Sequence, residues 1–276
     1  MSRKMDSTLP FVSAMLCETI YRFGMLEGNR MFTAREAVFG AALAGTAAAV
    51  LLFVLCLCRD GLCVRGIREC YLAAAFLLCG TVMLETLLRI ISVCRTEFGG
   101  ALWAMLFALL VLGLLPAFSA LQRMAYPVAG LAALGGILAL LGIARQLRWQ
   151  NLSFAPLTSG GVASAFSAAF VFIPEYLLLP LCTSCDTRKW LRLPALSGIV
   201  FLLLILCAEM LFGYDAANGC LSVREGIRAW GLGCFSRFDP LWTGLWLLLA
   251  YYRLLLLGSL MQKVWNSFRK GGECKI

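Results

Sequence analysis

Five charged side chains interrupt the long apolar runs of this chain: Glu85, Arg89, Glu175, Glu209 and Arg253. At the centre of a membrane helix each would cost about 2.5–3.5 kcal/mol on insertion scales, so each needs a partner or a function. Glu85 and Arg89 are four residues apart with the acid first, a spacing that favours an ion pair on one helix face. We expect this pair to be structural, with contact to a solute or an ion as the alternative.

Glu175 directly follows Pro174 in the middle of an apolar run at 162–182. A proline removes a backbone hydrogen bond and disfavours helix in the residue before it, so the sequence predicts a broken helix here. The residues upstream, from Gly160 and Gly161 onward, are mostly small. Small residues allow close helix packing, whereas a broken helix with a carboxylate at the break is also how transporters build a binding site. Both interpretations stay open.

Arg253 lies about halfway along the last apolar run, at a depth similar to that of Glu85 and Glu175. Two carboxylates and a guanidinium at one level of a membrane can neutralise one another. Alternatively, they can bind the ammonium and the carboxylate of an amino acid. We expect Glu175, Arg253 and Glu85, with Pro174 and the Gly160–Gly161 entry, to form a ligand site.

The composition indicates which elements must position these side chains. Of 276 residues, 61% are hydrophobic and only 14% are charged, which is far from the average of soluble domains. At about 20 apolar residues per crossing, the length accommodates one transmembrane domain and no separate catalytic domain. The expected class is therefore an all-α protein that crosses the membrane many times. The expected spans are 9–26 (weak), 37–58, 71–93, 101–121, 124–143, 162–182, 195–213 and 240–262.

The distribution of Lys and Arg between the loops predicts the orientation. With eight crossings, the basic residues concentrate on the side that carries both termini, which the positive-inside rule places in the cytoplasm. The net charge of +9 is then a consequence of topology, and we expect no nucleic-acid partner. Histidine is absent, which excludes His-ligated metals and Ser-His or Cys-His catalysis. We expect no enzyme activity.

Thirteen cysteines raise the question of a metal or a disulfide. Cys182 and Cys185 have C-x-x-C spacing, and other cysteines lie on the same predicted side of the membrane. The remaining spacings are irregular, and cysteine in a membrane helix usually behaves as a small hydrophobic residue. We therefore expect no metal and no cofactor, with a Cys-only site or one external disulfide, among Cys94, Cys220 and Cys234, as the alternatives.

Short motifs resemble the spore-germination permease family, the B subunits of nutrient germinant receptors within the amino acid, polyamine and organocation transporter superfamily. The motifs are Asn151-Leu152-Ser153-Phe154-Ala155-Pro156, Phe172-Ile173-Pro174-Glu175-Tyr176, and Phe235-Ser236-Arg237-Phe238-Asp239-Pro240-Leu241-Trp242 followed by Trp246. The resemblance extends over about residues 35–265 as a pattern of hydropathy and loops. It aligns the 162–182 run with the sixth helix of the family and the last run with the eighth.

The resemblance implies a permease fold of two inverted five-helix repeats, here partial, with a broken sixth helix. The chain ends at Ile276, so the ninth and tenth helices have no counterpart, and 9–26 alone represents the first helix. It further implies a sensor of a small amino-acid-like nutrient in the inner membrane of a bacterial spore, with an A-type subunit and a lipoprotein C-type subunit as partners. The alternatives are a secondary transporter and a non-binding scaffold or degenerate paralogue.

Overall fold

The computed structural model describes residues 8–25, 32–57, 65–100, 103, 118–144, 147–152, 154–172, 174–181, 187–217 and 239–269. All regular structure in these residues is helical, as the sequence predicts. The elements are α1 (Leu9–Met25), α2 (Ala34–Leu57), α3 (Arg65–Phe98), α5 (Phe118–Ile143), η2 (Trp149–Asn151), α6 (Ser159–Phe170), η3 (Pro174–Leu181), α7 (Thr187–Ala217) and α9 (Asp239–Arg269).

Four helices in the described part of the chain are long and apolar enough to cross a membrane. They cover Ala34–Leu55, Glu69–Thr96, Trp190–Leu211 and Trp242–Phe268. These spans coincide with four of the apolar runs. Large apolar side chains such as Val50, Leu77, Leu88 and Leu203 are more than half exposed on them, as expected for faces that contact lipid. The chain is thus a helical protein of the multi-pass membrane class.

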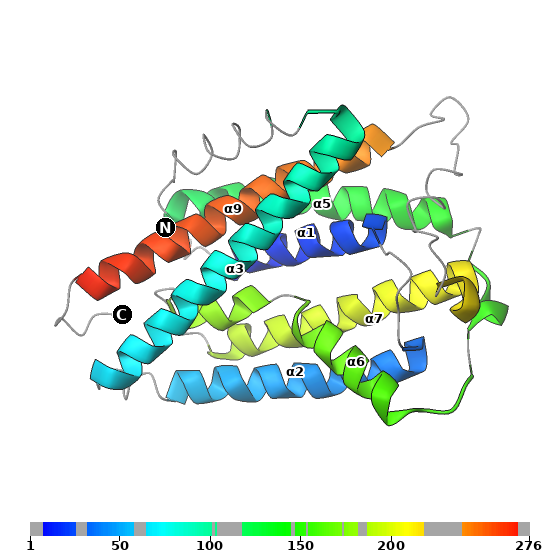
Figure 1. Ribbon diagram of the computed structural model, residues 1–276, viewed down its shortest axis with the longest axis horizontal. Coiled ribbons are helices and arrows are strands. Elements are labelled where there is room, and N and C mark those ends of the chain that lie inside the picture. Colours follow the sequence, from blue (N-terminus) through cyan, green and yellow to red (C-terminus); the bar gives the residue numbers. More distant parts are fainter. Residues whose placement is uncertain are drawn as a thin grey trace, which may run out of the picture.

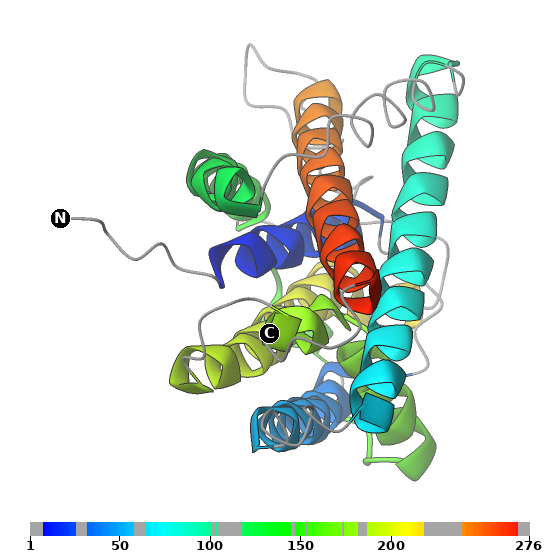
Figure 2. The ribbon, with the colours of Figure 1, turned by 90° about the vertical axis from the view of Figure 1, so that its left-hand side faces the viewer.

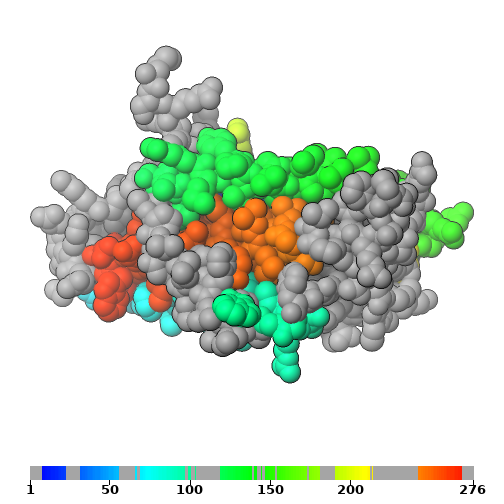
Figure 3. All heavy atoms as spheres, turned by 90° about the horizontal axis from the view of Figure 1, so that it is seen from above, coloured from blue at the N-terminus to red at the C-terminus, as the bar shows by residue number. Residues whose placement is uncertain are grey.

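The helices form two groups that cross each other. In Figure 1, α2 and α7 run side by side in the lower half, with α6 packed on α2, whereas α9 lies above them and α3 runs obliquely from the lower left to the upper right. The turned view shows α3 and α9 converging toward the red end of α9, with α1 lying between the two groups (Figure 2). Seen from above, α5 and α9 lie together on one face of the molecule (Figure 3). α1 therefore contacts both groups.

Small residues determine how closely α2 and α6 approach. The buried positions of α6 are Gly161, Ala165 and Ala169, one helical turn apart. Opposite them, Gly40 of α2 has so little space that a Cβ atom there would lie 2.5 Å from Ala165 Cβ and 2.6 Å from the Phe166 backbone nitrogen. Such small-residue stripes let two backbones pack almost directly against each other. The small residues upstream of Glu175 therefore pack α6 against α2.

The structure breaks the sixth apolar run where the sequence predicts it. α6 ends at Phe170 and η3, a 3₁₀ helix, begins at Pro174, and the two are bent by 50°. The proline has no N–H to donate and its ring excludes the α-helical conformation one turn back. The break leaves Glu175 in the first turn of η3, inside the bundle.

The fifth helix begins earlier than the sequence predicts. α5 starts at Phe118 and continues through Arg123, so the expected interruption between the runs 101–121 and 124–143 lies inside a helix. A charged residue ends an apolar run without ending a helix, because Arg is a good helix former. Most of the expected 101–121 span lies outside the described residues.

Candidate functional site

Four elements bring charged side chains together in the interior. Glu18 lies on α1, Arg89 on α3, Glu175 on η3 and Arg253 on α9. One oxygen of Glu18, Oε2, accepts from Arg89 Nη1 at 2.7 Å and from Arg253 Nη1 at 2.9 Å. The Nε group of Arg253 donates to Glu175 Oε1. A single connected network therefore joins elements that are far apart in the sequence.

Two further residues extend this network toward its edge. Arg22 Nε donates to Glu18 Oε1 at 2.7 Å, one turn along α1, and Arg89 Nη2 donates to Glu85 Oε1, one turn along α3. We call the six residues the buried charge network: Glu18, Arg22, Glu85, Arg89, Glu175 and Arg253. Three carboxylates and three guanidinium groups sum to no net charge. Neutrality of this kind is what allows charges to remain in an apolar interior.

Burial increases from the edge of the network to its centre. The side chain of Glu85 is 52% exposed and that of Arg89 19%, whereas those of Glu18, Glu175 and Arg253 are exposed by 3%, 0% and 4%. A buried ion pair survives only with good geometry and further hydrogen bonds, because desolvation of each ion costs several kcal/mol. The centre of the network is therefore where removal of one partner has the largest effect.

One atom at the centre accepts no hydrogen bond from the described residues. Glu175 Oε2 is buried and unpartnered, although Oε1 of the same carboxylate is paired with Arg253. A buried carboxylate oxygen normally has at least one donor, and a missing donor costs about 1–3 kcal/mol. This oxygen lies at the break between α6 and η3, so it is a position at which an additional N–H or O–H donor would be stabilising.

Aromatic rings flank the arginines of the network. The Arg89 guanidinium lies 4.3 Å from the ring centroid of Tyr21, and Tyr21 packs on Trp246 with centroids 5.2 Å apart. Arg22 lies 5.4 Å from the ring of Phe172, which belongs to the break itself. Cation–π contacts of this kind hold a guanidinium without using its hydrogen-bond donors. The Tyr21 contacts connect α1 to α3 and α9, and the Arg22 contact connects α1 to the segment between α6 and η3.

The structure brings some of the expected site residues together and separates others. Glu175 and Arg253 form an ion pair, and Pro174 lies next to Glu175, whereas Glu85 reaches the network only through Arg89. Gly160 and Gly161 lie at the other end of α6, a helix of 12 residues or about 18 Å. At that end of α6, Gly161 packs against Glu36 of α2.

Glu18 is the central residue that the sequence analysis did not select. It binds three of the network's arginines, but its apolar segment is short and lies near the N-terminus. The spacing of Glu18 and Arg22 is the same i,i+4 spacing that identifies Glu85 and Arg89. This repeated spacing is the signal that could have identified it.

A second carboxylate cluster ties the beginnings of α2 and α6 together. Glu36 Oε2 accepts from the Thr33 backbone N–H at 2.9 Å, and Thr33 Oγ1 accepts from the Glu36 N–H at 3.2 Å, a reciprocal capping box. The other oxygen, Oε1, accepts from the Thr158 N–H at 2.9 Å and from its hydroxyl at 2.6 Å. Glu209, the fifth charged residue of the apolar runs, accepts from the Ala34 N–H at 2.5 Å. These acids stabilise helix N-termini.

Thr158→Ala is expected to lower the free energy of unfolding by about 0.5–2 kcal/mol, the usual cost of losing an N-cap. The threonine hydroxyl accepts from the Gly161 N–H at 3.0 Å and donates to Glu36, so both bonds are lost. Detergent unfolding followed by circular dichroism measures the change. Thr158→Ser keeps the hydroxyl and should therefore retain most of the wild-type stability. Thr46→Ala, which removes an exposed hydroxyl on α2, should change it by less than about 0.5 kcal/mol.

The cysteine alternatives fall largely outside the described residues. Cys182, Cys185, Cys220 and Cys234 are among the residues that are not described, whereas Cys94 is a buried free thiol. Within the described ranges, no group of three or more Cys, Asp or Glu side chains is arranged to hold a metal ion.

The comparisons with known proteins give no relative. No protein-family model, no curated protein and no solved structure matches this chain. What the buried charge network does must therefore follow from its charges, its burial and its position at the break between α6 and η3.

Proposed function

We propose that this chain is a permease-like membrane protein in which Glu175 and Arg253, at the buried centre of the charge network, receive a small amino-acid-like solute. The observation that supports the proposal most is Glu175 Oε2, a buried oxygen at the break between α6 and η3 that accepts from no donor in the described ranges. The ammonium of an amino acid supplies such donors, and charge-assisted hydrogen bonds are the strong ones. A broken helix at this point is the kind of element from which secondary transporters build solute sites.

Arg253 is the proposed partner for the carboxylate of the solute. It uses Nε and Nη1 for Glu175 and Glu18, and a guanidinium carries five N–H donors in a fixed fork. The network is neutral, so a zwitterion adds no net charge when it enters. Binding therefore exchanges ion pairs within the protein for ion pairs with the solute. The solute shifts the protein between two conformations only to the extent that it binds one of them more tightly than the other.

We propose that the chain is a sensor. This role rests on the resemblance of the motifs at 151–156, 172–176 and 235–246 to germinant-receptor B subunits. In this role the chain lies in the inner membrane of a bacterial spore, binds a nutrient without chemical conversion, and transmits the change to A-type and lipoprotein C-type subunits. Coupled transport of the same solute is the second candidate. It is favoured by the broken helix alone.

Glu175→Gln is expected to weaken solute binding about ten- to hundredfold, the loss of one charge-assisted hydrogen bond. The full chain in lipid nanodiscs is titrated with radiolabelled L-alanine. Propionate, which lacks the amine, and ethylamine, which lacks the carboxylate, serve as weaker competitors. Glu85→Gln is the matched control, because Glu85 is half exposed and does not contact Glu175; it should leave the affinity of the wild type unchanged.

Binding that is unchanged in both Glu175→Gln and Arg253→Lys would contradict the proposed site. If L-alanine and a panel of other amino acids fail to bind the wild type, the six charges merely neutralise one another and the chain is a scaffold. Uptake of the bound amino acid into proteoliposomes separates the two candidates that bind: accumulation driven by an ion gradient indicates transport, and saturable binding without uptake indicates sensing.

A further inference from the structure

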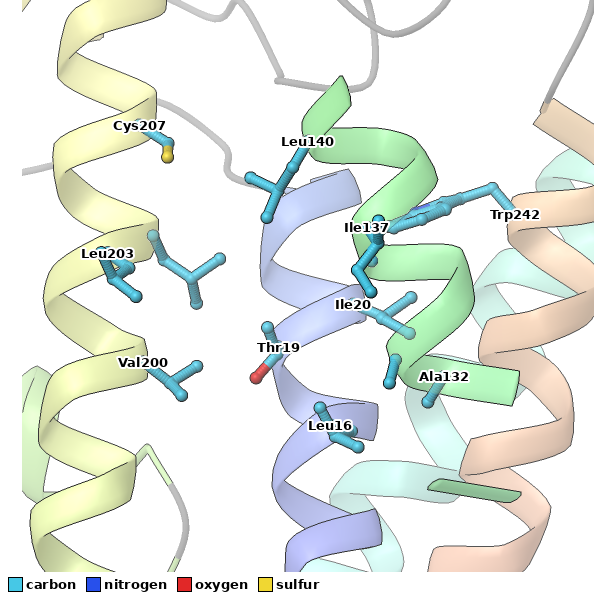
Figure 4. A pocket seen from close by; sticks show the side chains of 13 residues that line it. Leu16, Thr19, Ile20, Ala132, Ile137, Leu140, Val200, Leu203, Cys207 and Trp242 are labelled. Atoms are coloured by element: carbon cyan, nitrogen blue, oxygen red, sulfur yellow. The ribbon is translucent and has the colours of Figure 1, made fainter. Parts of the chain in front are cut away.

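An apolar cleft lies on the other side of α1 from the buried charge network. It has a volume of about 240 Å³ and is lined by residues of α1, α5, α7 and α9. In Figure 4, Leu203 of α7 lies across the cleft from Leu16 and Thr19 of α1. Ile137 of α5 and Trp242 of α9 lie on the α1 side of the cleft, away from α7. An empty cavity of about 150 Å³ already holds a benzene molecule, so this cleft has room for a longer hydrocarbon.

The chemistry of the cleft walls selects hydrocarbon. All lining residues other than Thr19, Cys207 and Trp242 are glycine or aliphatic. The Thr19 hydroxyl already donates to the Met15 carbonyl at 2.8 Å, within its own helix. Apart from Thr19, Cys207 and the indole of Trp242, the lining has no polar side chain and no charge, so it favours an apolar ligand over a polar one. An unbranched apolar chain fits this lining.

The position of the cleft determines where such a chain comes from. Ile137, Leu140 and Leu203 line the cleft and are also about half exposed on the outside of the bundle, at 55%, 48% and 54%. The α7 side of the cleft lies within the candidate membrane span Trp190–Leu211. The cleft therefore opens toward the hydrocarbon layer, where lipid is the solvent. We infer that the cleft is a binding site for one acyl chain of a membrane lipid.

The acyl chain would pack against the face of α1 that points away from the buried charge network. At 100° per residue, Leu16 and Ile20 lie on the side of α1 opposite to Glu18, and Thr19 lies between that side and Glu18. The cleft lies between these residues of α1 and residues of α7. A chain in the cleft fills this gap and holds Glu18 toward Arg89 and Arg253. The proposal requires no solute and is independent of the proposed function.

Photolabelling tests the site. The purified full chain is reconstituted into phosphatidylcholine vesicles that contain a phosphatidylcholine with a diazirine in the middle of one acyl chain. After irradiation, mass spectrometry of the peptides should find label on Leu16 or Thr19 of α1, in addition to Leu131 and Leu134 on the outer face of α5. The α5 label comes from any surrounding lipid and shows that the protein is folded and inserted.

Two glycine variants on α5 provide the matched comparison. A Cβ at Gly136 or at Gly130 meets no atom within 4 Å, but only Gly136 lines the cleft. Gly136→Leu fills the cleft and should abolish the α1 label while leaving the α5 label, whereas Gly130→Leu should preserve both. An unlabelled α1 in the wild type, beside a labelled α5, would overturn the proposal in favour of a closed cleft or a partner helix. So would an α1 label that persists in Gly136→Leu.

Discussion

Glu18→Gln is expected to lower the free energy of unfolding by about 3–5 kcal/mol, the cost of breaking a buried ion pair by removing one partner. Glu18 binds Arg22, Arg89 and Arg253, so the neutral amide leaves three guanidinium groups against two carboxylates. Arg253, with 4% of its side chain exposed, cannot recover this loss from water. The change should be the largest of any single charge removal in the described residues.

Detergent unfolding measures this effect, with the thiol of Cys17 as an independent reporter. Cys17 precedes Glu18 and is buried, so an apolar maleimide should modify it only when the centre of the bundle opens. We expect faster modification in Glu18→Gln than in the wild type, in proportion to the lost stability. The rate at which Cys17 is modified therefore reports how often the bundle opens next to Glu18.

Glu85→Gln is the matched control for this prediction. It also removes one carboxylate from Arg89, but Glu85 is 52% exposed, and pairs at such positions contribute about 0–1 kcal/mol. Its unfolding and its Cys17 reactivity should stay close to those of the wild type. Equal losses of unfolding free energy in Glu18→Gln and Glu85→Gln would show that the network stabilises the fold through its total charge. The burial of Glu18 would then have no separate effect on stability.

Gly40→Ala should lower the free energy of unfolding by about 1–3 kcal/mol, as overpacking of a well-packed core does. The added methyl group would lie 2.5 Å from Ala165 Cβ and 2.6 Å from the Phe166 nitrogen, and the latter is backbone that cannot rotate away. α2 and α6 must therefore separate. This separation would also strain the bonds from Glu36 to Thr158, which join the same two helices.

The same substitution five residues further along α2, at Gly45, should change the free energy of unfolding in the opposite direction. A Cβ at Gly45 meets only the Pro194 carbonyl oxygen, at 3.8 Å, which is an ordinary contact. Gly45→Ala should therefore stabilise the protein by up to about 1 kcal/mol, through the higher helix propensity of alanine. Thermal unfolding in detergent compares the two variants directly. Destabilisation by Gly45→Ala of the same size would refute close α2–α6 packing as the cause.

The sequence by itself determined the features that depend on near neighbours. Apolar runs of about 20 residues predict membrane helices, because each residue must leave water separately. Pro174 predicts the break because it acts on its own turn, and the spacing of Glu85 and Arg89 predicts their pair because both lie on one helix. Similar depth in the membrane also suggested that Glu175 and Arg253 could meet.

The tertiary structure alone decided which surfaces meet. Glu18 and Arg253 are 235 residues apart, and Glu36 and Thr158 are 122 residues apart, so neither pair leaves a local pattern. Gly161 was expected at the entry of the ligand site, and the structure packs it against Glu36 at the beginning of α6. The orientation of α6 and the position of α1 between the two helix groups follow from how small-residue stripes and charges fit together, and that fit exists only once the helices have packed.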